Sequence, residues 1–598
     1  MKNLGVPLVS TKSFPIKAFL ITSISSPDDF SFMGAAHLQK LAHRYGFYCQ
    51  KISIGEFHVS VVSESVMDLS SFQLQSFSFI LGQIEAHPYG WDRFLRINID
   101  KGRLAVENDY AGSIPVFYSQ RGGLSLSNIE PCVYLATGSS FNDFSYENMY
   151  GFLRYSHFIW EETAWNHINQ VLPDSRYIFL SNGKLLSDEY LATVKSSKSR
   201  SAYSNKQVAD ELFQLNCHLV RRSLEDAENI ILPLSSGYDS RMIYSVLAND
   251  PVLRKKTQCF TYGGAGSIEV EGSRRLAQLK GVDWRHVELP CKFLSLDRLE
   301  NIADIFGASL HMHGMYQMEF FDEIRKHHVL PRSARLTSGF MTGVPAGQHN
   351  GLLGISRADT RLSDAMNRFS QSKVWLEADL ARMPVFAGKD YQELAESRFR
   401  KAFDRFDGEV HQKAVMFDIW TRQRNFVSYY PRVFEWLCPV ASPHMCTEYA
   451  NFFMSLNKEH LRDRRAVELM FLSHYPDIAK VASNSNGIKS MGSHFEISMF
   501  IVSGMLRRLG LPNPLPLRYR NTPIEFDLQS VRHSREESVY PLLVEQPDVE
   551  AFLQGFGGRS IFSDLYSQAV NGDSRAYARL VTFQAVPFNG LLALKGIA

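Results

Sequence analysis

The chain has 598 residues, with 64 lysines and arginines against 62 aspartates and glutamates, which gives a formal net charge of +2. Its length exceeds what a single hydrophobic core accommodates, so we expect two or more domains. A hydrophobic fraction of 45% is typical of a globular protein. The balanced charge excludes an electrostatic argument for binding nucleic acid or an anionic membrane.

The seven cysteines are scattered, odd in number and without C-x-x-C spacing. This pattern disfavours a disulfide framework or a zinc ribbon and favours a reducing compartment. The N-terminal residues lack the apolar core and cleavage site of a signal peptide, and no run of about 18 apolar residues occurs. We therefore expect a cytoplasmic protein without a transmembrane segment or a nucleic-acid partner. The sequence does not decide whether the protein forms a homodimer.

Residues 1–120 are rich in short β-branched or aromatic runs separated by polar turns, which predicts strands. The clearest runs are residues 14–25, 49–54, 57–62 and 77–81. Residues 94–106 alternate between apolar and polar on both sides of an Asp-Lys-Gly turn, which predicts a β-hairpin.

After this hairpin come five spaced residues, namely Asp109, Gly112, Pro115, Phe117 and Tyr118. Their spacing resembles the Arg-Asp-x-x-Gly-x-x-Pro-Leu-Tyr-Tyr segment in the glutamine amidotransferase domain of asparagine synthetases, and residues 155–180 resemble the end of that domain. The resemblance implies an antiparallel sandwich of the N-terminal-nucleophile hydrolase type over residues 1–194.

The nucleophile of that family is absent. Working members expose an N-terminal cysteine, whose thiol attacks the glutamine amide while its free amine acts as base. This chain begins Met1-Lys2, and its nearest cysteine, Cys49, is internal. We therefore expect a degenerate amidotransferase-like domain that is retained for structure and does not hydrolyse glutamine.

A polar segment at residues 195–203 predicts a linker to a second domain, residues 204–598. Helical periodicity begins near Ser204 and leads into an apolar run at residues 230–234. A small-residue turn and a helical segment follow. A strand, a tight loop and a helix N-terminus together make an anion site, and Asp239 within the turn offers a carboxylate for a magnesium ion.

Two further strands are expected at residues 257–263 and 284–289, with a helix at 270–279 between them. Alternating strands and helices predict a parallel sheet with helices on both faces and ligands at the carboxyl ends of the strands. Both the turn at Asp239 and the connection at residues 261–269 lie at such ends.

The turn reads Leu234-Ser235-Ser236-Gly237-Tyr238-Asp239-Ser240-Arg241. It lacks the lysine of a Walker motif, and resembles the pyrophosphate loop of ATP pyrophosphatases, with Ser236 in place of the usual glycine. The strand Phe260-Thr261-Tyr262-Gly263 and the helix start at Glu269 extend the resemblance to asparagine synthetases. Ser240-Arg241 and Trp284 resemble a divergent branch encoded with surface-polysaccharide biosynthesis enzymes and related to β-lactam synthetases and lasso-peptide cyclases.

The resemblance implies an adenine-nucleotide α-hydrolase-like (PP-loop) domain that binds ATP and Mg²⁺. The implied cofactor-binding residues are Leu234, Ser235, Ser236, Gly237, Asp239, Ser240, Phe260, Thr261, Tyr262, Gly263, Glu269 and Gly339. Asp239 is implied as the metal ligand and, with Lys489, as a catalytic residue. Lys489 corresponds to a loop lysine that neutralises charge on the acyl-adenylate and pyrophosphate, and a simple exposed lysine is the alternative.

Residues 338–349 resemble the glycine-rich loop that carries a second magnesium-binding aspartate in this family, but Gly343 or a neighbour stands at the acidic position. Losing a carboxylate weakens a magnesium site. The expected function is an ATP-dependent, AMP- and pyrophosphate-forming ligase that joins a small carboxylate to ammonia or an amine. A catalytically impaired nucleotide-binding or assembly module, and a lasso-peptide or β-lactam type cyclase, remain alternatives.

Residues 360–435 are predicted to be helical. Arg422 and Arg424 are expected on solvated faces, and pairing with a substrate acid is the alternative. Two more helices are expected at residues 448–456 and 465–475. A helical extension begins at about residue 495. We expect its apolar helix at residues 499–509 to pack against the rest of the chain, and a membrane-surface role is the alternative.

Overall fold

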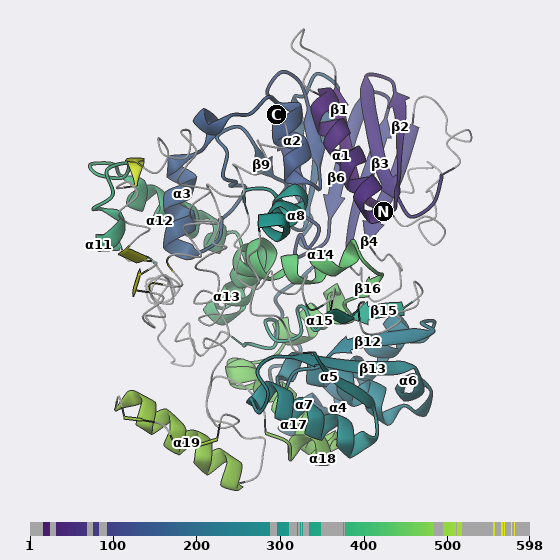
Figure 1. The fold of residues 1–598 in the computed structure, drawn as a ribbon, viewed down its shortest axis with the longest axis vertical. Helices are drawn as coiled ribbons and strands as arrows, with labels where there is room; N and C mark the ends of the chain where they lie inside the picture. The colour runs from purple at the N-terminus through teal and green to yellow at the C-terminus, as the bar shows by residue number, and fades with distance from the viewer. Residues whose placement is uncertain are drawn as a thin grey trace.

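The computed structural model describes residues 16–23, 31–67, 76–82, 93–287, 296–309, 334–348, 377–482 and 494–509, together with a few single positions outside these ranges. The described residues contain two β-sheets (Figure 1). The N-terminal sheet, in purple, lies above a smaller sheet in teal, and helices from the second half of the chain, in green, lie between and beside them.

The N-terminal sheet has eleven strands in one curled, hydrogen-bonded array. Its order is β11-β10-β6-β5-β4-β1-β8-β7-β9, with β3 also pairing with β1, and β2 with β3. All pairings are antiparallel except the single-residue contact of β1 with β4. The antiparallel pairing expected of the predicted sandwich is therefore confirmed, but hydrogen bonds join the described strands in one curled sheet.

The elements of this part run in the following order. They are β1 (Ile16–Ser23), α1 (Ser31–Tyr45), β2 (Tyr48–Ile54), β3 (Phe57–Ser63), β4 (Ser76–Gly82), β5 (Phe94–Asp100), β6 (Arg103–Asn108), β7 (Phe117–Ser119), β8 (Ser125–Ser127), α2 (Glu130–Ala136), a 3₁₀ turn (Phe141–Asp143), α3 (Tyr146–Tyr155), β9 (Asn169–Gln170), β10 (Ser175–Leu180) and β11 (Leu185–Tyr190). Helix α1 lies where only strands are expected.

The hairpin and the motif that follows it have clear physical roles. Strands β5 and β6 meet at Lys101 and Gly102, whose φ angles of 48° and 74° suit the tight turn that matches strand twist. Asp109 is buried and accepts hydrogen bonds from the backbone N–H groups of Ala111 and Ser113. Gly112, at φ 56°, leaves room for a proline ring that its own Cβ would approach to 3.0 Å. The motif residues therefore fix the chain's path after β6.

The second sheet has the order β14-β13-β12-β15-β16 and is parallel throughout. Its elements are α4 (Asn205–Leu224), β12 (Asn229–Pro233), α5 (Tyr238–Asn249), α6 (Pro251–Lys256), β13 (Thr257–Tyr262), α7 (Ile268–Lys280), β14 (Asp283–Val287), α8 (Leu296–Phe306), β15 (Ala334–Thr337) and β16 (Val440–Ala441). The predicted parallel sheet with alternating helices is confirmed. The start of α4 follows from a capping box, in which Ser204 and Gln207 bond each other's backbone N–H.

The segment expected to be a linker is tied to the second half of the chain. Lys195 N donates to Asn451 Oδ1 at 2.8 Å, and Ser197 N donates to the Met454 carbonyl at 3.2 Å. Arg200 donates to Glu211 of α4 at 2.7 Å. The connection between the two sheets is thus held by hydrogen bonds along its length.

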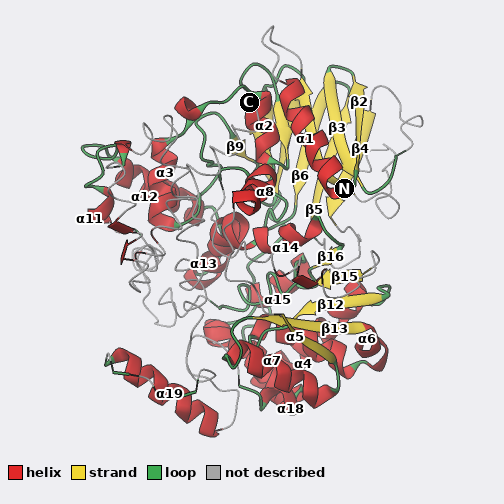
Figure 2. Cartoon of the chain, in the orientation of Figure 1, coloured by secondary structure: helices red, strands yellow, loops and turns green. Residues whose placement is uncertain are grey.

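The second half of the chain is mainly helical (Figure 2). Its elements are α11 (Glu377–Leu380), α12 (Tyr391–Asp404), α13 (Val410–Asp418), a π-helix (Ile419–Val427), α14 (Tyr429–Glu435), α15 (Thr447–Met454), α16 (Lys458–Leu461), a short 3₁₀ turn (Arg462–Arg464), α17 (Arg465–His474), α18 (Pro476–Ala479) and α19 (His494–Arg508). The helices predicted at 448–456 and 465–475 are confirmed as α15 and α17.

The π-helix joins the two halves of the molecule through buried hydrogen bonds. Arg424 is 1% exposed and donates to the carbonyls of Trp160 and Val171 at 3.0 and 2.8 Å. Trp420 Nε1 donates to the Tyr110 carbonyl at 3.1 Å, and Asn425 Nδ2 donates to another N-terminal carbonyl at 2.7 Å. The expectation that Arg424 is solvated is wrong, because its guanidinium satisfies carbonyls of the N-terminal half.

The apolar helix α19 lies beside the body of the molecule (Figure 1). Ile501, Val502 and Met505 are 53%, 43% and 58% exposed. The expectation that this helix packs against the rest of the chain is therefore wrong for this face. Among the helices that the structure describes, none combines the length and apolar character needed to cross a bilayer.

The buried arginine at the junction can be tested directly. Arg424→Ala leaves the Trp160 and Val171 carbonyls without their donor, which costs about 2 kcal/mol or more because buried acceptors then stay unsatisfied. We expect a thermal unfolding midpoint several degrees below that of the unmodified protein. Arg422→Ala is the matched control, since Arg422 is only partly buried and contacts the Phe426 ring. Equal midpoints for the two variants would contradict this role.

Candidate functional site

The loop between β12 and α5 closes on itself at the carboxyl end of the central strand. Ser235 N donates to Ser240 Oγ at 3.0 Å, and Gly237 N donates to Ser235 Oγ at 3.1 Å. Leu234 N continues the sheet by donating to the Phe260 carbonyl at 2.8 Å. These hydrogen bonds fold the backbone of the loop tightly between β12 and α5.

The first turn of α5 carries Asp239. Its N-cap, Gly237, provides no side-chain hydrogen bond. The first N–H groups of any α-helix lack intrahelical acceptors, and the helix dipole favours negative charge there. The Asp239 side chain is 39% exposed, so its carboxylate is within reach of a ligand. This end of α5 is therefore suited to an anion that arrives with a cation.

Ser236 replaces the glycine usual in such loops, and the structure accommodates it. The side chain is fully buried, and Ser236 N donates to Glu269 Oε2 at 2.9 Å. A Cβ on Gly272 of α7 would lie 2.6 Å from the Ser236 Cβ, so a glycine opposite makes room for the serine. Glu269, predicted to bind the cofactor, thus lies against the loop backbone and holds it.

The buried side chain of Arg241 holds the loop in place through hydrogen bonds. It has no exposed surface and donates to the Ser236 carbonyl at 2.7 Å and to the Val481 and Ala482 carbonyls at 2.8 and 3.0 Å. Burial lowers the pKa of the Arg241 guanidinium to about 10, which leaves it charged at neutral pH. The loop is therefore linked to the segment that follows α18.

The residues at the end of β13 that were predicted to bind the cofactor make packing contacts and hydrogen bonds within the protein. Phe260 is fully buried in a hydrophobic cluster, so its side chain does not face the loop opening. Thr261 Oγ1 donates to the Leu234 carbonyl at 2.7 Å and accepts from Trp284 Nε1 at 2.9 Å. Tyr262 is partly buried, and the Gly263 carbonyl lies 2.8 Å from a histidine ring nitrogen.

A glycine-containing loop, residues 338–348, packs directly on the start of α5. A Cβ on Gly339 would lie 3.0 Å from the Asp239 carbonyl carbon and 3.2 Å from Ser240 N. A Cβ on Gly343 would lie 2.8 Å from Asp239 Oδ1. The position expected to carry a second carboxylate is therefore next to Asp239, and it has no side chain.

A buried hydrogen-bonded network holds this loop in place. Thr342 Oγ1 is 2.7 Å from His444 Nδ1, and His444 Nε2 is 2.8 Å from Asn216 Oδ1 of α4. Tyr449 O–H donates to the Thr342 carbonyl at 2.7 Å. Burial lowers the pKa of His444 to about 3, so the ring is neutral, accepting from the threonine and donating to the amide oxygen.

Arg464 lies at this site and was not predicted to do so. Its guanidinium lies 3.9 Å from Asp239 Oδ1 and 4.3 Å from the centre of the Tyr238 ring. Asp463 and Arg464 have φ angles of 49° and 64°, and Met341 in the facing loop has 65°. Such strained non-glycine conformations gather at functional sites. The sequence signal was the run of four charged residues at 462–465.

The site has few metal-ligating groups of its own. Across the residues that the structure describes, no three histidine, cysteine, aspartate or glutamate side chains are grouped to hold a metal ion. A divalent cation at Asp239 would therefore depend on oxygens from a bound molecule, such as phosphates. Lys489, the other predicted catalytic residue, lies outside the described residues.

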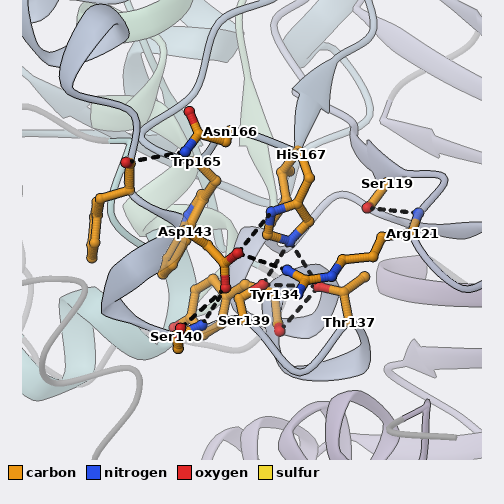
Figure 3. Close-up of polar contacts among 12 residues, drawn as sticks. Ser119, Arg121, Tyr134, Thr137, Ser139, Ser140, Asp143, Trp165, Asn166 and His167 are labelled. Carbon is orange, nitrogen blue, oxygen red and sulfur yellow. Dashed lines mark hydrogen bonds and ion pairs between the residues drawn. The ribbon is translucent and has the colours of Figure 1, made fainter. Parts of the chain in front are cut away.

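A second polar cluster lies at the end of α2 (Figure 3). His167 Nε2 is 2.8 Å from Ser139 Oγ, and His167 Nδ1 is 3.9 Å from Asp143 Oδ1, which also accepts from Arg121 at 2.7 Å. These residue types occur in hydrolytic triads.

The backbone around this serine does not support hydrolysis, however. Ser139 is 6% exposed, and its N–H donates to the Tyr134 carbonyl. The next N–H, of Ser140, donates to Asp143 Oδ2 at 2.8 Å. Because both N–H groups already have acceptors, they do not form an oxyanion hole. We assign this cluster to closing the C-terminal end of α2.

No model of a known protein family matches the chain, and no curated protein matches it.

The close contact between Gly339 and α5 predicts that a larger residue at position 339 destabilises the protein. Gly339→Ala forces the loop or the helix to shift, because its Cβ would meet Asp239 and Ser240 backbone atoms. We expect a loss of about 1–3 kcal/mol, read as a lower thermal unfolding midpoint. Gly264→Ala is the control, since nothing lies within 4 Å of its added Cβ. A Gly339→Ala midpoint equal to that of Gly264→Ala would show that the contact is not tight.

The buried histidine predicts a dependence of stability on pH. Its pKa is about 3 when folded against a reference value of 6.5, so the unfolded chain binds the proton first as the pH falls. His444 therefore stabilises fully above pH 6.5, and about 2–3 kcal/mol of this is lost by pH 4.5. Unfolding midpoints should fall less between pH 7 and 4.5 in His444→Gln than in the unmodified protein. His58→Gln, at an exposed histidine of β3, should leave the pH dependence unchanged.

Proposed function

We propose that the chain is an ATP-dependent ligase that activates a carboxylate with release of pyrophosphate and then forms an amide. The observation that carries the proposal is the placement of Asp239. It lies in the first turn of α5 at the end of the central parallel strand, with Arg464 3.9 Å away and the loop at Gly339 and Gly343 packed against it. This arrangement suits a polyphosphate bound with a cation.

The residues fit the implied nucleotide and Mg²⁺. Asp239 supplies a carboxylate beside the N-terminal N–H groups of α5, and Gly343 adds no side chain of its own next to that carboxylate. Mg²⁺ bound at Asp239 would neutralise negative charge on the leaving pyrophosphate. Arg464 adds a second positive charge to that leaving group, and Glu269, with its bond to Ser236, keeps the loop closed.

The reaction proceeds in two displacements. A carboxylate oxygen of the substrate attacks the α-phosphorus of ATP, and the bond to pyrophosphate breaks. The nitrogen of ammonia or an amine then attacks the carbonyl carbon, AMP leaves, and the nitrogen loses a proton. The chain's residues orient the triphosphate and stabilise charge on the departing groups. The family resemblance favours a sugar acid, aspartate or a peptide as the carboxylate.

In this proposal the nitrogen comes from free ammonia or from an amine-bearing substrate. The N-terminal domain, of the amidotransferase-like type, then serves as the structural partner of the π-helix. A cyclase of the lasso-peptide or β-lactam type is the same chemistry with the amine and the carboxylate in one molecule.

Gly343 favours a second candidate. With one carboxylate at the metal position, the chain would bind nucleotide but catalyse poorly, as an assembly module of asparagine synthetase-like fold. This candidate shares the nucleotide site with the ligase and differs only in turnover.

The test is pyrophosphate release from ATP and Mg²⁺ with a panel of uronic acids, amino acids and amines. The ligase predicts release that depends on a carboxylate and falls about 100-fold or more in Asp239→Asn, because the charge that holds the cation is lost. Asp283→Asn, at the opposite end of the sheet, should release pyrophosphate at the unmodified rate.

Calorimetry with α,β-methylene-ATP separates the remaining outcomes. Cation-dependent binding without pyrophosphate release from any substrate pair favours the non-catalytic module. An absence of nucleotide binding in the unmodified protein contradicts both candidates.

A further inference from the structure

The space beside Asp239 that a side chain at position 343 would fill is occupied by Gln348. A Cβ on Gly343 would lie 2.1 Å from Gln348 Oε1 and 2.8 Å from Asp239 Oδ1. The side-chain amide of one residue and the carboxylate of the other therefore flank the same point. Glycine at 343 is what allows the amide to be there.

The backbone brings Gln348 to this point. Gln348 N donates to the Gly343 carbonyl at 3.0 Å, so residues 343–348 fold back on themselves. Within this turn Gly347 has a φ angle of 87°, which glycine adopts without strain. One residue before the turn, Thr342 is fixed by His444 and Tyr449. The approach of Gln348 to Asp239 is thus built by the loop and its support.

The chemistry of the amide suits the point that it flanks. Side-chain carbonyl oxygens of glutamine are ligands for hard divalent cations, as carboxylates are, but they carry no charge. With Arg464 beside Asp239, the charges of these side chains balance. Such a site holds a bare cation weakly, and its affinity rises when phosphate oxygens bring the remaining negative charge.

We propose that Gln348 takes the place of the second acidic ligand, so that its side-chain oxygen and Asp239 together hold a divalent cation that arrives with the nucleotide. The inference rests on the proposed function for the identity of the nucleotide. It gives the glycine at position 343 a role, because an aspartate there would displace the amide.

Binding measurements test this without turnover. Calorimetry with α,β-methylene-ATP and Mg²⁺ should show about tenfold weaker binding in Gln348→Ala, and equal affinities of the two proteins in EDTA. Gln348→Glu should bind Mn²⁺ more tightly than the unmodified protein in the absence of nucleotide, as measured by electron paramagnetic resonance of free Mn²⁺. Gln258→Ala, at the amino half of β13, is the matched control and should behave as the unmodified protein.

The outcomes separate the two proposals. Cation-dependent nucleotide binding that is unchanged in Gln348→Ala overturns the role of Gln348 and leaves the ligase intact. Weaker Mn²⁺ binding in Gln348→Glu also overturns it, because the amide would then act as a hydrogen-bond donor to Asp239. An unmodified protein that binds no nucleotide overturns the proposed function, and the role of Gln348 with it. Thermal unfolding of each variant shows whether a loss of binding reflects a loss of folding.

Discussion

The arrangement of this site depends on the close contact between residues 338–348 and the first turn of α5. Gly339 approaches Asp239 and Ser240 so closely that a single added carbon would lie 3.0 Å from the helix backbone. Asp239 of α5 thereby lies close both to the loop that follows β15 and to Arg464 in the turn before α17, which are far apart in the sequence. Because the loop is also held by the buried His444 network, packing fixes the position of Asp239 relative to Gly343 and Gln348.

Two departures from the loop pattern on which the proposed function rests are matched by neighbouring residues. Ser236 fits because Gly272 faces it, and Glu269 accepts a hydrogen bond from its backbone. Gly343 leaves space that the amide of Gln348 fills. In each case a change of size at one position is compensated by a residue that lies nearby in space. Random erosion of a disused site would not be expected to produce such pairs, so both observations favour a site that is still used.

Local patterns in the sequence predicted much of the fold. The strands, the β5–β6 hairpin and the alternation that builds the parallel sheet follow from periodicity and turn chemistry, which act over a few residues. The strand–loop–helix unit around Asp239 was found in the same way. Residues whose roles depend on distant partners were missed or misread. Arg424 was predicted to be a solvated helix residue. Nothing near Gln348 in the sequence indicates that its side chain reaches Asp239. Both roles arise only from tertiary packing.

Packing also links the N-terminal half of the chain to the site. Trp420, Arg424 and Asn425 of the π-helix donate to four backbone carbonyls of the N-terminal half, and on another side Glu130 accepts hydrogen bonds from Ser309. Removing the N-terminal half would leave these donors buried or newly exposed without their acceptors, at a cost of about 1–3 kcal/mol for each group left buried. The π-helix is followed by α14 and then by β16. Strand β16 pairs with β15, the strand that leads into the loop facing Asp239. The N-terminal half therefore supports the site through the segment of the chain that leads from the π-helix to β16.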